Sequence, residues 1–127
     1  MPDNCPFCSL EPKRIITESK LTVTIRDGFP VSPGHTLIIP KRHVASFFAV
    51  TDAERNELIR ALDSAKEELD RESSPDSYNI GINDGQAAGQ TVPHLHIHLI
   101  PRFTGDSADP RGGLRWLFPD KAKYWKE

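Results

Sequence analysis

The sequence lacks several features that would assign the chain to a specialised class of protein. It has no apolar run near the roughly 18 residues that a membrane span needs. A formal net charge of -2 provides no basic field for nucleic acid or a membrane surface. No signal-peptide pattern follows Met1, because the next three residues are polar or proline. These absences predict a cytoplasmic protein with neither a nucleic-acid nor a membrane partner.

Cysteine is also scarce, since the chain has only Cys5 and Cys8. Two thiols three positions apart are too few and too local for a disulfide framework. Three interpretations of the pair remain: half of a metal site, a redox Cys-x-x-Cys motif, or two inert thiols. A redox motif normally follows a strand and opens a helix, whereas this pair precedes every predicted strand. The metal site is therefore the favoured interpretation.

A length of 127 residues with no linker-like composition predicts one domain over residues 1–127, and the periodicity of the apolar residues predicts that it is α+β. Thr51 and Glu54 form a capping-box signature, and apolar residues at helical spacing follow it, which predicts a helix over 51–72. Alternating, branched residues predict five strands, over residues 14–18, 21–27, 35–40, 78–83 and 92–101. An apolar helix that covers one face of an antiparallel sheet of about five strands gives an α+β layer pair.

Three of the five histidines, His94, His96 and His98, alternate with apolar residues in the last predicted strand. A side-chain period of two puts their imidazoles on one face. Imidazole titrates near neutral pH, so one ring can be nucleophilic while another is cationic and binds phosphate. Neutral imidazole is also a metal ligand. The spacing leaves phosphate chemistry and metal binding open, and favours both over a polar face without function.

The loop over residues 84–91 leads into the histidine stretch and is rich in hydrogen-bond donors. It offers the backbone N–H groups of Gly85 and Gly89, the amide of Gln90 and the hydroxyl of Thr91. Convergent donors of this kind suit an anionic ligand that is rich in oxygen. Zinc prefers four nitrogen or sulfur ligands, so the two cysteines with two histidines would make a closed, structural site. Such a site leaves the remaining histidines available for phosphate chemistry.

Residues 94–100, His-Leu-His-Ile-His-Leu-Ile, resemble the His-φ-His-φ-His-φ-φ signature of the histidine-triad (HIT) superfamily of nucleotide hydrolases and transferases, where φ is an apolar residue. Residues 89–92 and 33–43 also resemble the segments that surround this signature in the family. The resemblance covers about residues 5–102, the core, and leaves a C-terminal tail over 103–127. It implies a HIT-like fold and a homodimer with a continuous sheet.

The resemblance also implies the catalytic residues. His96 corresponds to the nucleophile, which attacks the α-phosphate of a nucleotide and forms a covalent nucleotidyl-histidine. His98 corresponds to the histidine beside the phosphate oxygens, which stabilises charge and helps to protonate the leaving group. His35 corresponds to a further histidine that supports this proton network.

The nucleotide-binding and metal-binding residues follow from the same resemblance. The resemblance implies that Asp27 and Asn83 contact the ribose and that Gln90 and Thr91 contact the phosphates. It implies that Ile25 and Leu37 line the slot for the base. Zinc-bearing relatives use four ligands that correspond here to Cys5, Cys8, His43 and His94. The expected cofactor is therefore structural zinc.

The implied activity is release of a nucleoside monophosphate from a nucleotide conjugate. Dinucleoside polyphosphates such as diadenosine tetraphosphate, and nucleoside phosphoramidates, are the two substrate classes expected, with a purine nucleotide as the bound half. The alternatives are a catalytically slow nucleotide-binding sensor or adaptor, and a zinc-organised interaction module. The aromatic C-terminal tail, with Trp116, Phe118, Tyr124 and Trp125, is expected to influence substrate size.

Overall fold

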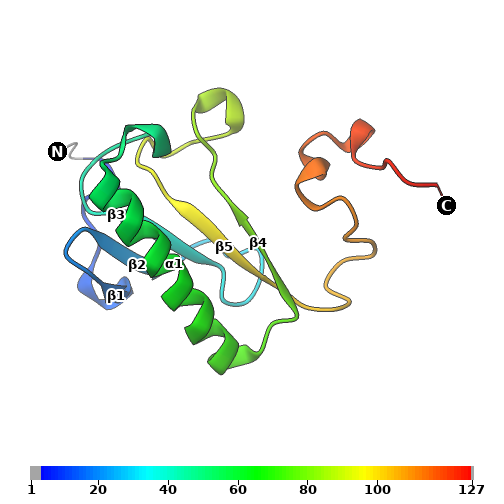
Figure 1. Cartoon of the computed structure of the whole chain (residues 1–127), viewed down its shortest axis with the longest axis horizontal. Coiled ribbons are helices and arrows are strands. Elements are labelled where there is room, and N and C mark those ends of the chain that lie inside the picture. Colours follow the sequence, from blue (N-terminus) through cyan, green and yellow to red (C-terminus); the bar gives the residue numbers. More distant parts are fainter. Residues whose placement is uncertain (1–3, 127) are drawn as a thin grey trace.

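The computed structural model describes residues 4–126 and consists of one sheet crossed by one long helix (Figure 1). The helix is α1, Asp52–Ser73, and the strands are β1 (Ile15–Glu18), β2 (Thr22–Arg26), β3 (Thr36–Pro40), β4 (Ser77–Gly81) and β5 (Ile97–Arg102). All neighbouring strands pair antiparallel, in the order β1-β2-β3-β5-β4. The predicted α+β class and element order are confirmed.

Helix α1 begins where the capping-box signature predicts. The Thr51 hydroxyl accepts a hydrogen bond from the Glu54 N–H at 3.0 Å, and the Glu54 carboxylate accepts one from the Thr51 N–H at 2.9 Å. Two donors that the helix itself leaves unpaired are thereby satisfied. Leu58 and Leu69 are fully buried against the sheet, and burial of each contributes about 1.5–3 kcal/mol. Within residues 4–126, no helix combines the length and the apolar character that a membrane span needs.

The sheet carries an apolar cluster on each of its two faces. The helix face includes Ile38 and Leu99, which pack with the buried residues of α1. The opposite face is built on Val23, Ile25, Leu37 and Ile39, and the N-terminal residues Phe7, Leu10 and Ile15 pack against it. Strands β3 and β5 pair so that Leu37 lies opposite His98. His98 therefore lies on the face that α1 does not cover.

Strand β5 begins at Ile97, five residues later than the sequence predicted, so this boundary was wrong. Pro93 has no backbone N–H for a ladder, and the His94 N–H bonds back to the Val92 carbonyl at 2.8 Å, which closes a tight turn. The Leu95 N–H then bonds to the Val44 carbonyl at 2.7 Å, outside the strand ladder. His94 and His96 consequently lie in an irregular entry segment, and only His98 lies in the strand.

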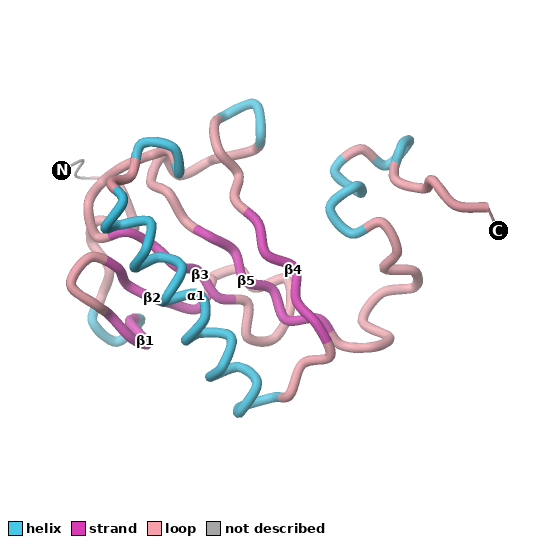
Figure 2. Tube along the Cα trace, viewed as in Figure 1, coloured by secondary structure: helices cyan, strands magenta, loops and turns pink. Residues whose placement is uncertain are grey.

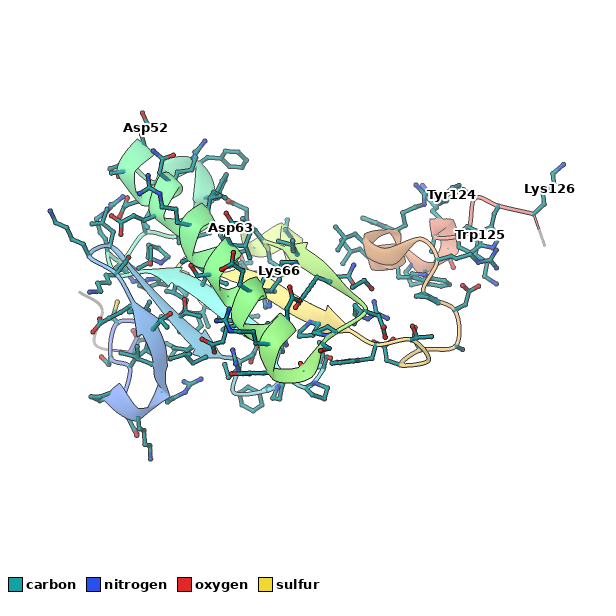
Figure 3. The ribbon with its side chains drawn as sticks, turned by 60° about the horizontal axis from the view of Figure 1, so that its bottom comes forward. Asp52, Asp63, Lys66, Tyr124, Trp125 and Lys126 are labelled. Carbon is teal, nitrogen blue, oxygen red and sulfur yellow. The ribbon has the colours of Figure 1, made fainter. Side chains whose placement is uncertain are left out.

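The C-terminal tail extends beyond the β4 edge and is mostly loop (Figure 2). Its helical parts are two short 3-10 turns, Gly113–Leu117 and Pro119–Lys121. Two cation–π contacts stabilise the tail internally. The Arg111 guanidinium lies 4.4 Å from the centroid of the Trp125 ring, and the Arg115 guanidinium lies 4.8 Å from that of the Tyr124 ring. Both aromatic residues lie near the C-terminal end (Figure 3).

Candidate functional site

Four predicted metal ligands come together from three separate parts of the chain. Cys5 and Cys8 lie on the N-terminal turn, where the Cys8 N–H bonds to the Cys5 carbonyl at 3.2 Å. His43 follows the end of β3, and His94 precedes β5. One ligand atom from each residue lies within 4.8 Å of all the others, and Cys5 and His94 are buried. This tertiary cluster is able to hold a metal ion.

Hydrogen bonds and distances in the cluster fit a tetrahedral cation. The His94 Nε2–H donates to the Pro40 carbonyl at 2.8 Å, so the lone pair of His94 Nδ1 faces the cluster. That Nδ1 lies 3.2 Å from His43 Nδ1, 3.4 Å from Cys5 Sγ and 3.5 Å from Cys8 Sγ. Tetrahedral zinc separates its ligands by about 3.3 Å for two nitrogens and about 3.6 Å for nitrogen and sulfur. The donor set therefore suits zinc.

His96 presents one free ring nitrogen to the open face of the sheet. Its Nδ1 lies 2.8 Å from the His94 carbonyl oxygen, which is an acceptor, so Nδ1 carries the proton. The lone pair of the neutral ring is then on Nε2. The Phe7 ring lies edge-on to His96, with centroids 5.1 Å apart, and limits the ring's rotation. The arrangement holds a nitrogen nucleophile in a single tautomer.

His98 is the end of a hydrogen-bonded chain that starts at a backbone amide. The Val31 N–H donates to His35 Nδ1 at 3.2 Å, which leaves the His35 proton on Nε2. His35 Nε2–H in turn donates to His98 Nδ1 at 2.9 Å. The neutral His98 ring therefore carries its own proton on Nε2. The Asp27 carboxylate lies 3.4 Å from His35 Nε2 and completes the group.

The chain of donors disfavours a second metal site at Asp27, His35 and His98, although their ligand atoms also lie within 4.8 Å of one another. A cation there would need lone pairs on both His35 Nε2 and His98 Nδ1. The Val31 N–H instead keeps the proton on His35 Nε2. A proton network is therefore the better description of these three residues.

Both histidines of this network are held in the neutral form. Burial lowers the pKa of His98 from 6.5 to about 4, with further lowering by His96 and His35 that Asp27 opposes. Burial also lowers the pKa of His35, again against the attraction of Asp27. At neutral pH, His98 is consequently a hydrogen-bond donor without a positive charge.

The predicted nucleotide-binding residues differ in how much of their surface a ligand can reach. Asn83 lines a pocket of about 220 Å³ together with His35 and His98. Ile25 and Leu37 are only 0% and 3% exposed, so they form the apolar base of the site and offer a ligand almost no surface.

The loop before the histidines uses its polar groups internally. The Gln90 side chain accepts from the Gly85 N–H at 2.8 Å and donates to the Ala45 carbonyl at 2.9 Å. Gly85 and Gly89 have φ of 102° and 95°, a region that favours glycine. Thr91 is exposed beside the turn that enters the histidine segment. Gln90 thus holds the loop closed, a role that the sequence did not reveal.

Several site residues were missed by the sequence analysis. Val31, Asn79, Ile100 and Leu114 line the pocket at His98, and Val31 also orients His35 through its backbone. A hydrogen bond donated by a backbone N–H does not depend on the type of residue, so the sequence gives no sign of it. Ile100 could have been found, because it continues the period-two row of the histidines along β5.

Fold and site together define an α+β protein in which a partly buried Cys2His2 cluster lies beside the imidazoles of His35, His96 and His98. The HIT domain family model matches residues 9–105, so the chain belongs to the HIT domain family.

Two curated relatives are named for nucleotide activities. The chain is 35% identical to the asymmetrical bis(5'-nucleosyl)-tetraphosphatase of Schizosaccharomyces pombe, over 76% of this chain and 53% of that protein. It is 33% identical to the AP-4-A phosphorylase of Mycobacterium tuberculosis, over 80% of this chain and 53% of that protein. The chain thus spans about half the length of each.

One solved structure with a similar fold contains zinc. A Zn-bound histidine triad family protein from Mycobacterium smegmatis has a TM-score of 0.75 and 32% identity, over 84% of this chain and 80% of that one.

Proposed function

We propose that the protein is a nucleotide hydrolase or transferase that attacks an α-phosphate through a covalent nucleotidyl-histidine at His96. The observation that carries the proposal is the 2.8 Å contact between His96 Nδ1 and the His94 carbonyl. It leaves the lone pair on Nε2, where phosphorus can be attacked in line. A catalytically slow sensor or adaptor with the same pocket is the alternative.

The reaction proceeds in two displacements at phosphorus. In the first, His96 Nε2 forms a bond to the α-phosphorus, and the bond from phosphorus to the leaving oxygen breaks with its electron pair on that oxygen. In the second, a water oxygen bonds to phosphorus, the P–N electron pair returns to His96 and the water proton passes to solvent. The two steps together replace one difficult displacement with two easier ones.

The neutral state of His98 favours anhydride substrates over phosphoramidates. Its Nε2–H stabilises the charge that develops on the phosphate oxygens, and His35 and Asp27 orient the ring. A phosphate leaving group departs as an anion, whereas an amine must first receive a proton. With the pKa of His98 near 4, little acid is available for that proton at neutral pH.

The favoured substrates are therefore dinucleoside polyphosphates such as diadenosine tetraphosphate, in keeping with the names of two relatives. We assign the ribose to Asp27 and Asn83 and the phosphates to the Gln90–Thr91 segment. Ile25 and Leu37 are buried, so they would support the purine-base slot from beneath and would not themselves contact the base. Asp27 already accepts the Phe29 N–H at 2.8 Å, so its position is set before a nucleotide binds.

Zinc is proposed as a structural cofactor held by Cys5, Cys8, His43 and His94. When bound, it would supply a cross-link between the N-terminal turn and the histidine segment. The ligands leave no open position for substrate. We further propose one domain over 1–127, with a core over about 5–102, a homodimer and a cytoplasmic location.

The decisive test is to trap the intermediate. Wild-type protein is mixed briefly with diadenosine tetraphosphate, quenched in base and analysed by mass spectrometry for an adenylyl group on His96. His96→Ala should lower the rate by several orders of magnitude and still bind adenosine monophosphate. Val92→Ala, a nearby change outside the proton network, is the matched control. Binding of nucleotides without turnover in the wild type would favour the sensor, and turnover by His96→Ala would remove His96 from its role.

A further inference from the structure

A short segment between β3 and α1, residues 44–47, supports the entry to the histidine strand. Its first carbonyl, that of Val44, accepts a hydrogen bond at 2.7 Å from the N–H of Leu95, the residue before the nucleophile. Its last carbonyl, that of Phe47, accepts one from Arg55 of α1 at 3.2 Å, and the Arg55 guanidinium lies 4.6 Å from the centroid of the Phe47 ring. This supporting segment is therefore fastened to the helix and to the nucleophile's neighbour.

The loop over residues 84–91, which follows β4 (Figure 1), is closed by its own hydrogen bonds. The Gly85 carbonyl accepts from the N–H groups of Ala88 and Gln90, both at 3.1 Å, and the Gly85 N–H donates to the Gln90 side chain at 2.8 Å. A loop closed in this way keeps its own shape. Its position relative to the histidines depends on contacts with other parts of the chain.

Asp84 attaches the start of this loop to the supporting segment. One carboxylate oxygen of Asp84, Oδ2, accepts from the Phe47 N–H at 2.9 Å and from the Ser46 hydroxyl at 3.1 Å. At the other end of the loop, the Gln90 side-chain amide donates to the Ala45 carbonyl at 2.9 Å. The loop is thus held at both ends by the same segment that holds the residue before the nucleophile.

We propose that Asp84 is a positioning residue, which sets the place of the phosphate-binding loop relative to the nucleophile. This assignment rests on the function proposed above, in which the Gln90–Thr91 segment contacts the phosphates. Asp84 acts through Ser46 and Phe47 and touches no substrate atom. Hydrogen bonds to a carboxylate are stronger than those between neutral groups, and loss of this acceptor would leave the Phe47 N–H unpaired. A displaced loop would bind phosphate less tightly and align the α-phosphorus less well for attack.

Adenosine and adenosine monophosphate together measure how tightly the loop holds phosphate, because they differ in that group alone. Asp84→Ala should weaken binding of the monophosphate about tenfold and change that of adenosine by less than about twofold. It should also lower kcat/KM for diadenosine tetraphosphate about 10–100-fold. Calorimetric titration measures both affinities, and steady-state kinetics measure the turnover. Unchanged monophosphate affinity, or equal weakening of both ligands, would overturn the proposal.

Glu57 of α1 provides a matched control. Its carboxylate accepts an equivalent pair of donors, the Ser19 hydroxyl at 2.6 Å and the Leu21 N–H at 3.1 Å, where the β1–β2 hairpin meets the helix. Glu57→Ala therefore removes the same kind of contact on the side of the sheet that α1 covers. Both affinities and kcat/KM should stay within about twofold of wild type. Weakening of monophosphate binding equal to that of Asp84→Ala would reduce the Asp84 effect to a general loss of stability and overturn the proposal.

Two conservative variants separate position from charge. The side-chain oxygen of Asp84→Asn can still accept both hydrogen bonds, so this variant should keep the monophosphate affinity within about threefold of wild type. A loss as large as that of Asp84→Ala would show that the negative charge itself is needed and would overturn a positioning role. Ser46→Ala removes one donor and keeps the carboxylate, so it should reproduce part of the loss, about threefold. It tests the proposal if Asp84→Ala does not fold, and an unchanged affinity would contradict it.

Failure of the proposed function is recognised separately in the wild type. A wild type that binds the monophosphate more tightly than adenosine but does not hydrolyse diadenosine tetraphosphate would refute the enzyme and leave the binding comparison valid. Equal affinities of the wild type for adenosine and its monophosphate would overturn the role of Asp84, because the loop would then hold no phosphate.

Discussion

His35 Nε2 lies 2.9 Å from His98 Nδ1, and the two ring centroids are 5.2 Å apart. Because His35 donates in this contact, His98 is left with its proton on the nitrogen that faces the pocket. The direction of donation is set by the Val31 N–H on the far side of His35. A backbone amide thus decides which tautomer of His98 meets the substrate.

Removal of His35 should slow the reaction more than it weakens binding. His35→Ala deprives His98 of its donor, so both tautomers become populated, and kcat should fall about 10–100-fold while KM changes less than about threefold. Steady-state kinetics on diadenosine tetraphosphate measure both parameters. Val31→Ala is the control, because it keeps the backbone N–H and should retain the wild-type kcat. A normal kcat in His35→Ala would show that the chain of donors has no catalytic role.

Stability should decrease on acidification through the range in which His98 titrates. The folded protein lowers the pKa of His98 from 6.5 to about 4. Between these values the unfolded chain binds more protons than the folded one, so the free energy of unfolding rises with pH. This contribution is complete above pH 6.5 and is lost as the pH falls to about 4.

Urea unfolding at several pH values measures this effect. His98→Asn removes the titrating group, so its free energy of unfolding should depend less steeply on pH between 4 and 6.5 than that of wild type. The pKa of His35 is lowered in the same direction, and those of Glu54 and Asp70 are lowered by their hydrogen-bond partners, so these groups contribute to the slope that remains. Identical slopes for the two proteins would contradict the assignment to His98.

Loss of the metal should loosen the N-terminal turn. His43→Ala removes one of the four ligands, and Cys5 and Cys8 then lose their tether to the histidine segment. We expect about one zinc per chain in the wild type and a large loss of zinc in the variant, with Tm lower by roughly 10 °C. Elemental analysis and thermal unfolding with and without a chelator test this. His98→Asn should keep its zinc, and zinc-free wild type with an unchanged Tm would refute the structural role.

The helix N-terminus should be a second source of stability. Glu54 is 3% exposed, bonds to the Arg42 guanidinium at 2.9 and 3.0 Å and accepts from the Thr51 N–H. Glu54→Ala removes these contacts and should cost roughly 2 kcal/mol in the free energy of unfolding, measured in urea. Glu67→Ala on the exposed side of α1 should change it by less than about 0.5 kcal/mol. Equal effects of the two changes would contradict the role of the cap.

Agreement between sequence and structure is closest where local interactions decide the outcome. The helix was predicted over 51–72 and occupies Asp52–Ser73, because its cap is formed by residues three positions apart. The strand with the histidines was predicted over 92–101 and occupies Ile97–Arg102. Its entry depends on a bond from Leu95 to Val44, and a pattern of alternation carries no signal for such a contact.

The sequence by itself determined the element order, the α+β class and the chemical groups available, because periodicity and residue type are local properties. The tertiary structure decided which partner each histidine of the triad contacts. It turned His94 toward the two cysteines and His43, left Nε2 of His96 free, and linked His98 to His35. It also placed Leu114 of the tail beside the pocket at His98. These outcomes depend on contacts between residues far apart in the chain and on backbone donors, and neither is written in the spacing of three histidines.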